Sequence, residues 1–324
     1  MQRGPAPIAE TTRWLHHGGE LVESRHAGHI VVVGPRDEVV SLGDPHRITF
    51  PRSAVKPFQA AASLELIGED LSPRLVAVGW ASHRAEPAQL AAVRDMLAFA
   101  GLDPADLTTP PADGDAAAGV PDPLRHNCSG KHALFALAGR AAGCPRDRLL
   151  DPDGPVQRHV LAVVREAVGP PVGVGVDGCG APAVAVPLAG LARAFRQLAD
   201  PDGRWTTVVA AGLAHPLLMG GTGRLESALL AAGVVAKPGA EGVFGAAWRD
   251  RSGQRYGVAV KAEDGARRAS AVALHGLLAA LKVVPDGVWT PPPVLGGGRP
   301  AGSVRSTHQV SAFADRLGAV RRPW

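Results

Sequence analysis

Hydrophobic and polar residues alternate with different periods at the ends and in the middle of this 324-residue chain. Residues 20–26, 29–33 and 38–42 predict short strands, because their apolar positions alternate and turn residues separate them. The first turn holds Ala27 and Gly28, and the second covers residues 34–37. Residues 255–261 have the same strand pattern near the other end of the chain. We therefore expect antiparallel strands from both ends.

Apolar residues three or four positions apart predict helices in the region between these strands and shortly after them. One helix opens at Glu86 and Pro87 and ends at Gly101, with Leu90 and Leu97 on a single face. The expected helices cover residues 86–101, 131–140, 154–167, 188–198, 223–233 and 266–281. Two long loops rich in proline and glycine are expected at 108–123 and 291–302.

This order of elements indicates an α+β fold, in which one antiparallel sheet is built from both chain ends and a helical region lies between them. We expect a single catalytic unit over residues 1–324, with the sheet in about 14–60 and 205–300 and the helical part in about 61–204. The length is sufficient for one large core or two modest domains, and no internal repeat is present.

The composition is that of an ordinary soluble globular protein, with 46% apolar and 20% charged residues. No apolar run approaches the roughly 20 residues that span a bilayer, so we expect no membrane partner. The net charge of +4 does not indicate nucleic acid, because the arginines are scattered and few aromatic residues lie between them. Residues 1–10 do not resemble a secretion signal, and three cysteines make a disulfide framework improbable. We therefore expect a cytoplasmic protein with free thiols.

Lysines are scarce: only five of the 34 basic side chains are lysines, namely Lys56, Lys131, Lys237, Lys261 and Lys282. Arginine serves wherever a permanent charge is enough, whereas an amine can be deprotonated and act as a base or a ligand. The retained lysines are therefore candidates for amine chemistry. A codon bias toward arginine would explain the same scarcity, so the count ranks these residues without identifying a site.

Ser53 and Lys56 form the first candidate pair, since residues three apart share one face of a helix. Pro57 is tolerated only in a first turn, which places the helix start near Ser53 and the serine at the positive end of the helix. A neutral Lys56 amine can take the serine proton, given burial or a second cation nearby. The alternative is a capping serine followed by a surface lysine. Ser82 likewise fits either a second hydroxyl of the same site or a helix cap.

A second candidate cluster contains Cys128, Lys131, His132 and Cys179. Two thiolates with a histidine or a neutral amine suit tetrahedral zinc and leave one position for water. Asp177 or the unused partner would support these ligands. Ligand chemistry alone favours His132, because an amine must first lose its proton. Buried apolar cysteines beside a glycine turn are the alternative.

Two glycine-rich segments have the composition of anion-binding loops. Residues 173–178 match the dinucleotide-binding pattern, but we reject that function because the residues that follow, including Pro182, cannot open the phosphate-binding helix. Residues 220–224 end in Arg224 and are suited to a substrate carboxylate. A plain turn before a helix is an equal alternative for them.

Several motifs occur together and in one order along the chain. They are Arg52-Ser53-Ala54-Val55-Lys56-Pro57-Phe58-Gln59, Ala81-Ser82-His83, His126-Asn127-Cys128-Ser129-Gly130-Lys131-His132, Asp177-Gly178-Cys179-Gly180-Ala181-Pro182, the glycine turn at 220–223, and Val260-Lys261-Ala262-Glu263-Asp264-Gly265. In this combination the chain resembles the rhizobial-type L-asparaginases, the asparaginase II family, from about residue 14 to 285. The last 40 residues match poorly.

The resemblance implies the fold of the serine β-lactamases and glutaminases, a homodimer, and L-asparagine as the substrate. Two Ser–Lys pairs are implied as catalytic residues, Ser53 with Lys56 and Ser82 with Lys261. The implied Zn²⁺ ligands are Cys128, Lys131 and Cys179, with His132 as a supporting residue; here the family disagrees with the ligand chemistry alone. The expected substrate-binding residues are Arg52, His83, Asn127, Asp177, Gly221 and Thr222.

One departure from the family concerns the turn after Ser82. The family usually has a glycine and a glutamate after Ser-His, whereas this chain has Arg84, Ala85 and Glu86. A side chain at Ala85 narrows this turn, which affects the fit of the substrate more than the chemistry.

The resulting hypothesis is an L-asparaginase that forms a serine acyl-enzyme and uses zinc for structure or for positioning the substrate. Two alternatives stay open. One is another Ser–Lys acyl hydrolase, such as a glutaminase, a β-lactamase or a peptidase. The other is a non-catalytic zinc-binding protein in which Ser53 caps a helix.

Overall fold

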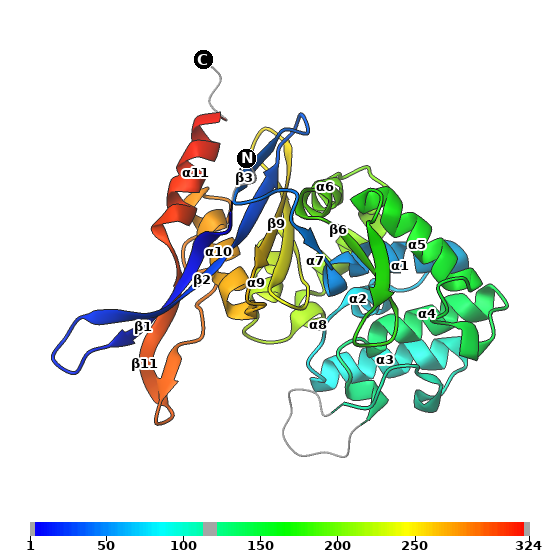
Figure 1. Ribbon diagram of the computed structural model, residues 1–324. Coiled ribbons are helices and arrows are strands. Elements are labelled where there is room, and N and C mark those ends of the chain that lie inside the picture. The colour runs from blue at the N-terminus through cyan, green and yellow to red at the C-terminus, as the bar shows by residue number, and fades with distance from the viewer. Residues whose placement is uncertain (1–3, 113–121, 321–324) are drawn as a thin grey trace. The chain divides into compact units, whose positions relative to one another are not determined.

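The computed structural model describes residues 4–112 and 122–320. Contacts divide the chain into two compact units, each made from more than one segment (Figure 1). Unit 1 consists of Met1–Thr49, Pro187–Ala199 and Ala236–Trp324. Unit 2 consists of Phe50–Val186 and Asp200–Val235.

The main sheet of unit 1 is built from strands at both ends of the chain. Its strands lie in the order β10-β11-β1-β2-β9-β8-β7, and β3 pairs with β2. Their bounds are β1 Ala6–Trp14, β2 Glu20–Val33, β3 Val39–Leu42, β7 Val235–Pro238, β8 Val243–Arg249, β9 Arg255–Ala262, β10 Val294–Gly296 and β11 Arg299–Ser306. The pairings of β1 with β2 and β11, and of β9 with β2 and β8, are antiparallel. The expected α+β fold, with a sheet from both chain ends, is confirmed.

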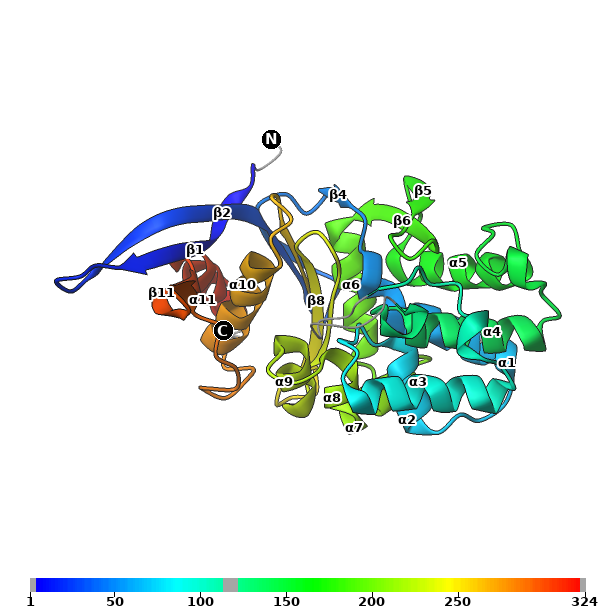
Figure 2. The ribbon, with the colours of Figure 1, turned by 90° about the horizontal axis from the view of Figure 1, so that it is seen from below.

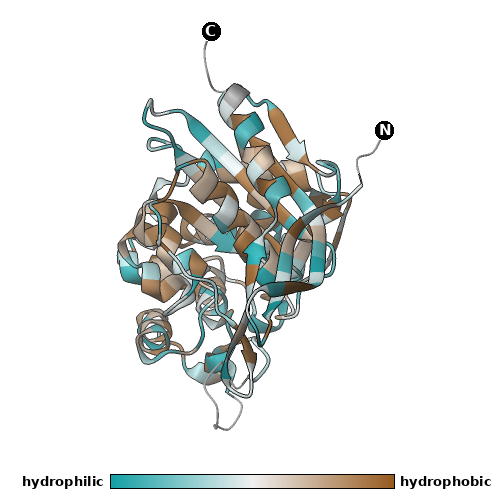
Figure 3. Cartoon of the chain, turned by 90° about the vertical axis from the view of Figure 1, so that its left-hand side faces the viewer, coloured by the Kyte–Doolittle hydropathy of each residue, from teal (hydrophilic) through white to brown (hydrophobic). Residues whose placement is uncertain are grey.

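Helices cover both faces of this sheet: α6 Leu188–Leu198 on one face, and α10 Arg267–Ala280 and α11 His308–Val320 on the other (Figures 1 and 2). Glycines allow α6 to approach closely. A Cβ at Gly257 would lie 2.1 Å from the carbonyl oxygen of Ala192, and one at Gly245 would lie 2.0 Å from the Phe195 ring. Figure 3 shows hydrophobic and hydrophilic segments on the same strands, as expected for a sheet whose buried and accessible positions are interleaved.

Unit 2 is mainly helical. Its helices are η1 Arg52–Val55, α1 Lys56–Ile67, α2 Pro73–Trp80, α3 Pro87–Ala100, η2 Pro104–Asp106, η3 Pro123–Arg125, α4 Ser129–Ala141, η4 Arg146–Arg148, α5 Pro155–Val168, α7 Thr206–Ala214, α8 Pro216–Gly220 and α9 Leu225–Ala231. β5 Gly173–Val176 and β6 Pro182–Pro187 form an antiparallel hairpin. α1 contacts α4, α5 and α2, so its first residue, Lys56, is carried into the interior of the unit. The remaining short strand, β4 Ile48–Thr49, belongs to unit 1.

Each of the six expected helices corresponds to a helix in the structure, namely α3, α4, α5, α6, α9 and α10. The expected turn at Ala27 and Gly28 is wrong, because both residues lie inside the continuous strand β2. A Cβ at Gly28 would lie 2.3 Å from the carbonyl oxygen of Lys261. Glycine therefore serves a close approach of two strands at this position and does not mark a turn.

The expected loop at 291–302 is also wrong, since β10 and β11 form a hairpin there. Gly297 and Gly298 have φ angles of 57° and 77°, which are typical of the tight turn that connects two antiparallel strands. Most of the other expected loop, at 108–123, lies outside the described residues. Within the described ranges, no helix is long and apolar enough to cross a membrane.

Candidate active site

The start of α1 places the first Ser–Lys pair. Pro57 stands in the first turn of α1, and η1 precedes it directly, so the helix begins where Pro57 predicts. Ser53 lies in η1, and its carbonyl oxygen accepts a hydrogen bond from the Lys56 backbone N–H. The Ser53 residue is half-buried, whereas Lys56 is only 1% exposed.

The Lys56 amine is held by three groups from two separate segments of unit 2. Its Nζ donates to the carbonyl oxygen of Ala81 at 2.5 Å, to Ser82 Oγ at 3.2 Å and to the carbonyl oxygen of Asn127 at 3.4 Å. The structure thus joins Lys56 to Ser82, the hydroxyl that the sequence assigned to Lys261. Ser53 Oγ is not among the hydrogen-bond partners found for this amine in the described residues.

Burial lowers the pKa of Lys56, and the nearby Lys131 ammonium lowers it further. The Cys128 and Cys179 sulfurs act in the opposite direction, but they do not cancel the effect of burial. This environment shifts the lysine toward the neutral amine, which is the form that can accept a proton from a serine.

The turn that carries Ser82 is fixed to the 220–223 loop. Ser82 N–H donates to the Met219 carbonyl oxygen at 3.0 Å. Glu86 accepts the backbone N–H of Thr222 at 2.9 Å, and Gln89 donates to the carbonyl oxygen of Leu217 at 3.1 Å. Glu86 and Gln89 also form the capping box of α3. The same residues therefore start a helix and hold a loop.

His83 is buried, and its hydrogen bonds define its tautomer. Ser129 Oγ donates to the Leu124 carbonyl oxygen, so it accepts the hydrogen bond from His83 Nε2–H at 2.8 Å. His83 Nδ1 then accepts the Ala85 backbone N–H at 3.2 Å. Burial first, and the Lys56 charge second, lower the pKa of His83 to about 3. The ring is therefore neutral and holds the turn to α4; its expected contact with substrate stays a prediction.

Two thiols and an amine meet next to this Ser–Lys region. Lys131 Nζ donates to Cys179 Sγ at 3.1 Å, and the Cys128 thiol donates to Asn127 Oδ1 at 3.0 Å. The Cys179 thiol donates to Cys128, which lowers the pKa of Cys128 and raises that of Cys179. The Lys131 ammonium also lowers the pKa of Cys128. The Cys128 thiol therefore loses its proton more readily than the Cys179 thiol, and both sulfurs lie beside a cation.

These residues fit the zinc ligands that the resemblance implies. Two ligands of a tetrahedral zinc ion are separated by roughly 3.5 Å, close to the distance between Lys131 Nζ and Cys179 Sγ. No group of three histidine, cysteine or acidic side chains in the described residues is placed to hold a metal, so a site here needs the Lys131 amine as its third ligand. His132 Nδ1 pairs with Thr108 Oγ1 at 2.6 Å, and its buried Nε2 makes no hydrogen bond within the described residues. The contacts thus place Lys131, and not His132, beside Cys179.

An ion pair connects the segment of Ser53 to the turn that carries Cys179. Arg52 Nε donates to Asp177 Oδ1 at 2.6 Å, and the same oxygen accepts the backbone N–H of Gly178 at 2.7 Å. Arg52 has a φ angle of 54°, which a non-glycine residue adopts only under constraint. Both charged groups already have partners, so the expected binding of a substrate carboxylate by Arg52 stays a prediction.

Two further buried lysines belong to unit 1. Lys261 lies on β9 opposite His29 and Val243, and its Nζ donates to the Ala262 carbonyl oxygen. Burial lowers the pKa of Lys261. Its pairing with Ser82 stays a prediction, because Ser82 belongs to unit 2. Lys237 on β7 is more deeply buried than Lys261, and the scarcity of lysine was the one sequence signal that pointed to it.

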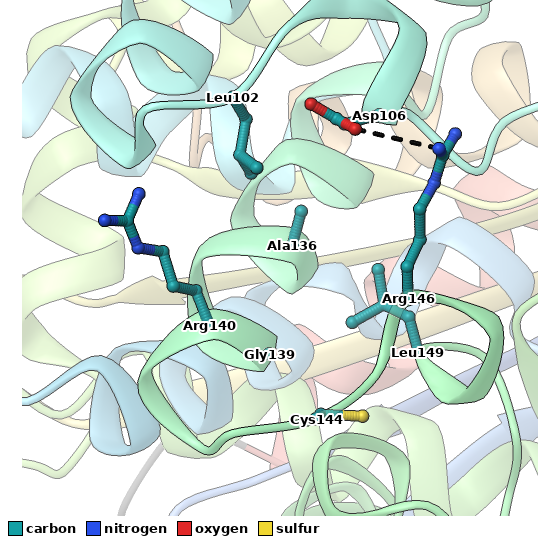
Figure 4. Close-up of a pocket in the computed structure, with 8 residues that line it drawn as sticks. All are labelled: Leu102, Asp106, Ala136, Gly139, Arg140, Cys144, Arg146 and Leu149. Atoms are coloured by element: carbon teal, nitrogen blue, oxygen red, sulfur yellow. Dashed lines mark ion pairs between the residues drawn. The ribbon is translucent and has the colours of Figure 1, made fainter.

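A pocket of about 170 Å³ in unit 2 does not contain any of these residues (Figure 4). It lies toward the far end of α4 and is lined by Leu102, Asp106, Ala136, Gly139, Arg140, Cys144, Arg146 and Leu149. Arg146 and Asp106 form an ion pair of 3.6 Å at its rim. The chemistry described above therefore lies outside this pocket.

A buried amine beside a serine hydroxyl is an arrangement that amine-assisted serine hydrolases use. The chain matches the family model described as L-asparaginase II over residues 14–306, and it belongs to that family. A comparison with curated proteins found no match.

Three solved structures show distant similarity. Mglu in its native form is 18% identical and is matched over 79% of this chain and 64% of its own, with a TM-score of 0.38. Bacillus glutaminase is 12% identical and is matched over 79% of this chain and 91% of its own, with a TM-score of 0.39. A probable glutaminase from Bacillus subtilis complexed with 6-diazo-5-oxo-L-norleucine is 15% identical. It is matched over 78% of this chain and 83% of its own, with a TM-score of 0.37. The chain spans less than two thirds of the length of Mglu. The assignment of an α+β fold is based on the sheet topology described above.

Proposed function

We propose that this protein is an L-asparaginase that hydrolyses the side-chain amide of L-asparagine to L-aspartate and ammonia. The observation that carries the proposal is the Lys56 amine, which is 1% exposed, hydrogen-bonded to Ser82 and three residues from Ser53. Membership of the L-asparaginase II family supports the choice of an amide substrate.

In the proposed mechanism, Ser53 Oγ attacks the amide carbon while neutral Lys56 accepts the serine proton. The proton passes to the leaving nitrogen, ammonia departs, and water then hydrolyses the β-aspartyl ester. The 3.2 Å contact between Lys56 Nζ and Ser82 Oγ supports Ser82 as the hydroxyl that returns protons to the amine. Lys261 is proposed as the second amine, which exchanges protons with Ser82.

The decisive experiment replaces the nucleophile. Ser53→Ala is expected to lower ammonia release from asparagine by at least about 10³-fold, as the loss of a catalytic serine does elsewhere. Ser72→Ala is the matched control, because Ser72 is exposed at the start of α2 and has no side-chain capping bond. Thermal unfolding should be the same for both variants. Full turnover in Ser53→Ala would refute the assignment.

The second amine is tested by a pair of variants. Lys261→Met should lower turnover with Ser82 intact, if Lys261 exchanges protons with that hydroxyl. Lys237 is the alternative, because it is also a buried lysine of unit 1. A loss in Lys237→Met, with normal rates in Lys261→Met, would transfer the role to Lys237.

For zinc, we propose that Cys128, Lys131 and Cys179 are the ligands. The bound ion would connect the start of α4 to the turn after β5 and would position a substrate group. Metal analysis of the purified protein should give close to one zinc per chain, and Cys179→Ser should abolish it. Chelation is expected to raise KM more than it lowers kcat, and an unchanged KM in the metal-free enzyme would contradict a positioning role.

The alternatives differ in their substrates. Glutamine and a chromogenic β-lactam would be turned over faster than asparagine by a glutaminase or a β-lactamase. A serine-directed covalent probe that does not label Ser53 would favour a non-catalytic zinc protein. We further propose a homodimer that works in the cytoplasm, which agrees with three free cysteines in the described residues.

A further inference from the structure

The strand β5 exposes a row of apolar side chains. Val174 and Val176 of β5 are 41% and 79% exposed, and they lie on one face because residues two apart in a strand point the same way. Val172, directly before β5, is 67% exposed, and its N–H donates to the Ala185 carbonyl oxygen. Single exposed valines are common on protein surfaces, whereas a continuous row of them marks a surface that another molecule covers.

The backbone of β5 also has an open edge. On its inner side it pairs with β6, with Gly173 opposite Ala185 and Gly175 opposite Ala183. Asp177 N–H donates to the Ala181 carbonyl oxygen, and this sets the alternation of the ladder. The N–H and C=O groups of Val174 and Val176 consequently face outward. Among the strands of the described chain, β6 is the one neighbour of β5.

Monomeric proteins usually protect such an edge with lysine, proline, a bulge or a covering helix. Residues 172–176 contain only valine and glycine, so the segment carries no charge and no proline. The glycine face is partly covered by Phe50, since a Cβ at Gly175 would lie 3.3 Å from the Phe50 ring. Phe50 is itself 43% exposed and extends the apolar surface.

The segment Val172-Gly173-Val174-Gly175-Val176 reads the same in both directions. Two copies that pair antiparallel about Val174 would therefore place valine opposite valine and glycine opposite glycine. The outward-facing groups of Val174 would then bond to Val174 of the partner subunit. A slip by one residue would set every valine against a glycine and lose the cross-strand valine pairs. This symmetry fits a second copy of this chain better than an unrelated strand.

From this geometry we propose that β5 is the interface of a two-fold homodimer, formed by antiparallel pairing of β5 with β5 of a second copy about Val174. The inference rests on the proposed homodimer and identifies its surface. β5 runs directly into Asp177, which pairs with Arg52, and the turn continues to Cys179. Pairing of β5 would therefore brace the strand that supports this part of the candidate site.

Val174→Lys places two like charges opposite each other at the two-fold axis. Sedimentation equilibrium should show a dimer for the unaltered protein and a dissociation constant raised by at least about 100-fold for the variant. Leu295→Lys is the matched control, because Leu295 is 56% exposed on the edge strand β10; it should stay dimeric. A monomeric unaltered protein, or a Val174→Lys dimer of unchanged affinity, would overturn the inference.

Disulfide cross-linking tests the register of the β5–β5 pairing, and it does not depend on whether Val174→Lys folds. In a Cys144→Ser background, Val174→Cys should form a covalent dimer under mild oxidation, since directly opposite residues have Cα atoms about 5.5 Å apart. Val172→Cys should not link to itself, but it should link to Val176→Cys in a mixture. Equal linking by Val172→Cys alone would overturn the register. Asparagine turnover by the unaltered protein is measured separately, so an unaltered dimer without activity contradicts the proposed function and leaves the interface intact.

Discussion

Lys56 and Lys131 are both buried in unit 2, yet their pKa values move in opposite directions. Burial lowers the pKa of Lys56, whose amine donates to two backbone carbonyls and a hydroxyl, and the opposing effect of the Cys128 and Cys179 sulfurs is too small to reverse this. For Lys131 burial acts in the same direction, but the attraction of the Cys128 and Cys179 sulfurs outweighs it and raises the pKa. The extent of burial is therefore not what separates a base from a permanent cation here.

The difference lies in which groups replace water around each amine. Neutral carbonyl and hydroxyl groups accept hydrogen bonds without supplying a full negative charge, so they stabilise the ammonium less than water does. A thiolate supplies that charge. The region around Lys56 thus favours proton transfer, and the region around Lys131 favours an ion pair or, after loss of a proton, a metal ligand.

The largest expected effect comes from Lys56→Met. Turnover of asparagine should fall by about 10³-fold or more, because the general base is removed. The free energy of unfolding should change by less than about 1 kcal/mol, since relief of the cost of burying the amine offsets the lost hydrogen bonds. Steady-state kinetics and urea unfolding on the same preparation check both. A variant that is much less stable but keeps its rate of asparagine turnover would contradict the role of Lys56 as the base.

Lys131→Met, unlike Lys56→Met, should lower the free energy of unfolding of the metal-free protein. Its loss leaves the Cys128 thiolate buried without its adjacent cation, which costs about 3 kcal/mol of stability. Urea unfolding at neutral pH measures this cost. Lys282→Met is the control, because the Lys282 side chain is 76% exposed, and it should unfold like the unaltered protein. Equal stability of the unaltered protein, Lys131→Met and Lys282→Met would mean that Cys128 is a neutral thiol.

The burial of His83 should make the stability of the folded protein depend on pH. Its pKa is lowered to about 3, so between roughly pH 6.5 and 3 the unfolded chain binds a proton that the folded chain excludes. Stability should consequently fall as the pH falls through this range. His83→Gln is expected to reduce the slope by up to about 1.4 kcal/mol per pH unit, whereas His46→Gln, at an exposed position, should leave it unchanged. Urea unfolding at several pH values provides the slopes.

The smallest effect concerns the turn after Ser82. Ala85 has a φ angle of 61°, a conformation that glycine adopts without strain. Ala85→Gly should therefore stabilise the protein by about 0.5 to 1 kcal/mol, measured by thermal unfolding. Ala98→Gly, at an exposed position inside α3, should destabilise it by about 1 kcal/mol. The opposite signs of these two alanine-to-glycine changes are the test; equal signs would remove the strain argument.

Local chemistry in the sequence predicted much of this molecule. Pro57 located the start of α1, and Gly101 the end of α3, because both residues act on their own backbone. Gly28 misled, because its role depends on the Lys261 carbonyl from another strand. Similarly, the proton position on His83 depends on Ser129, 46 residues away. What the sequence alone does not contain is the identity of neighbours that only the folded chain brings together.

The pairing of Ala9 with Ser306 has a consequence for how the chain is made. During synthesis from the N-terminus, β1 leaves the ribosome long before β11, the strand that lies beside it. The uninterrupted stretch Phe50–Val186 holds most of unit 2 and is available to compact early. Closure of contacts this distant in sequence is slow, so the sheet should be the last part to form. Until then β1 and β2 are exposed to aggregation and are the natural binding place for a chaperone.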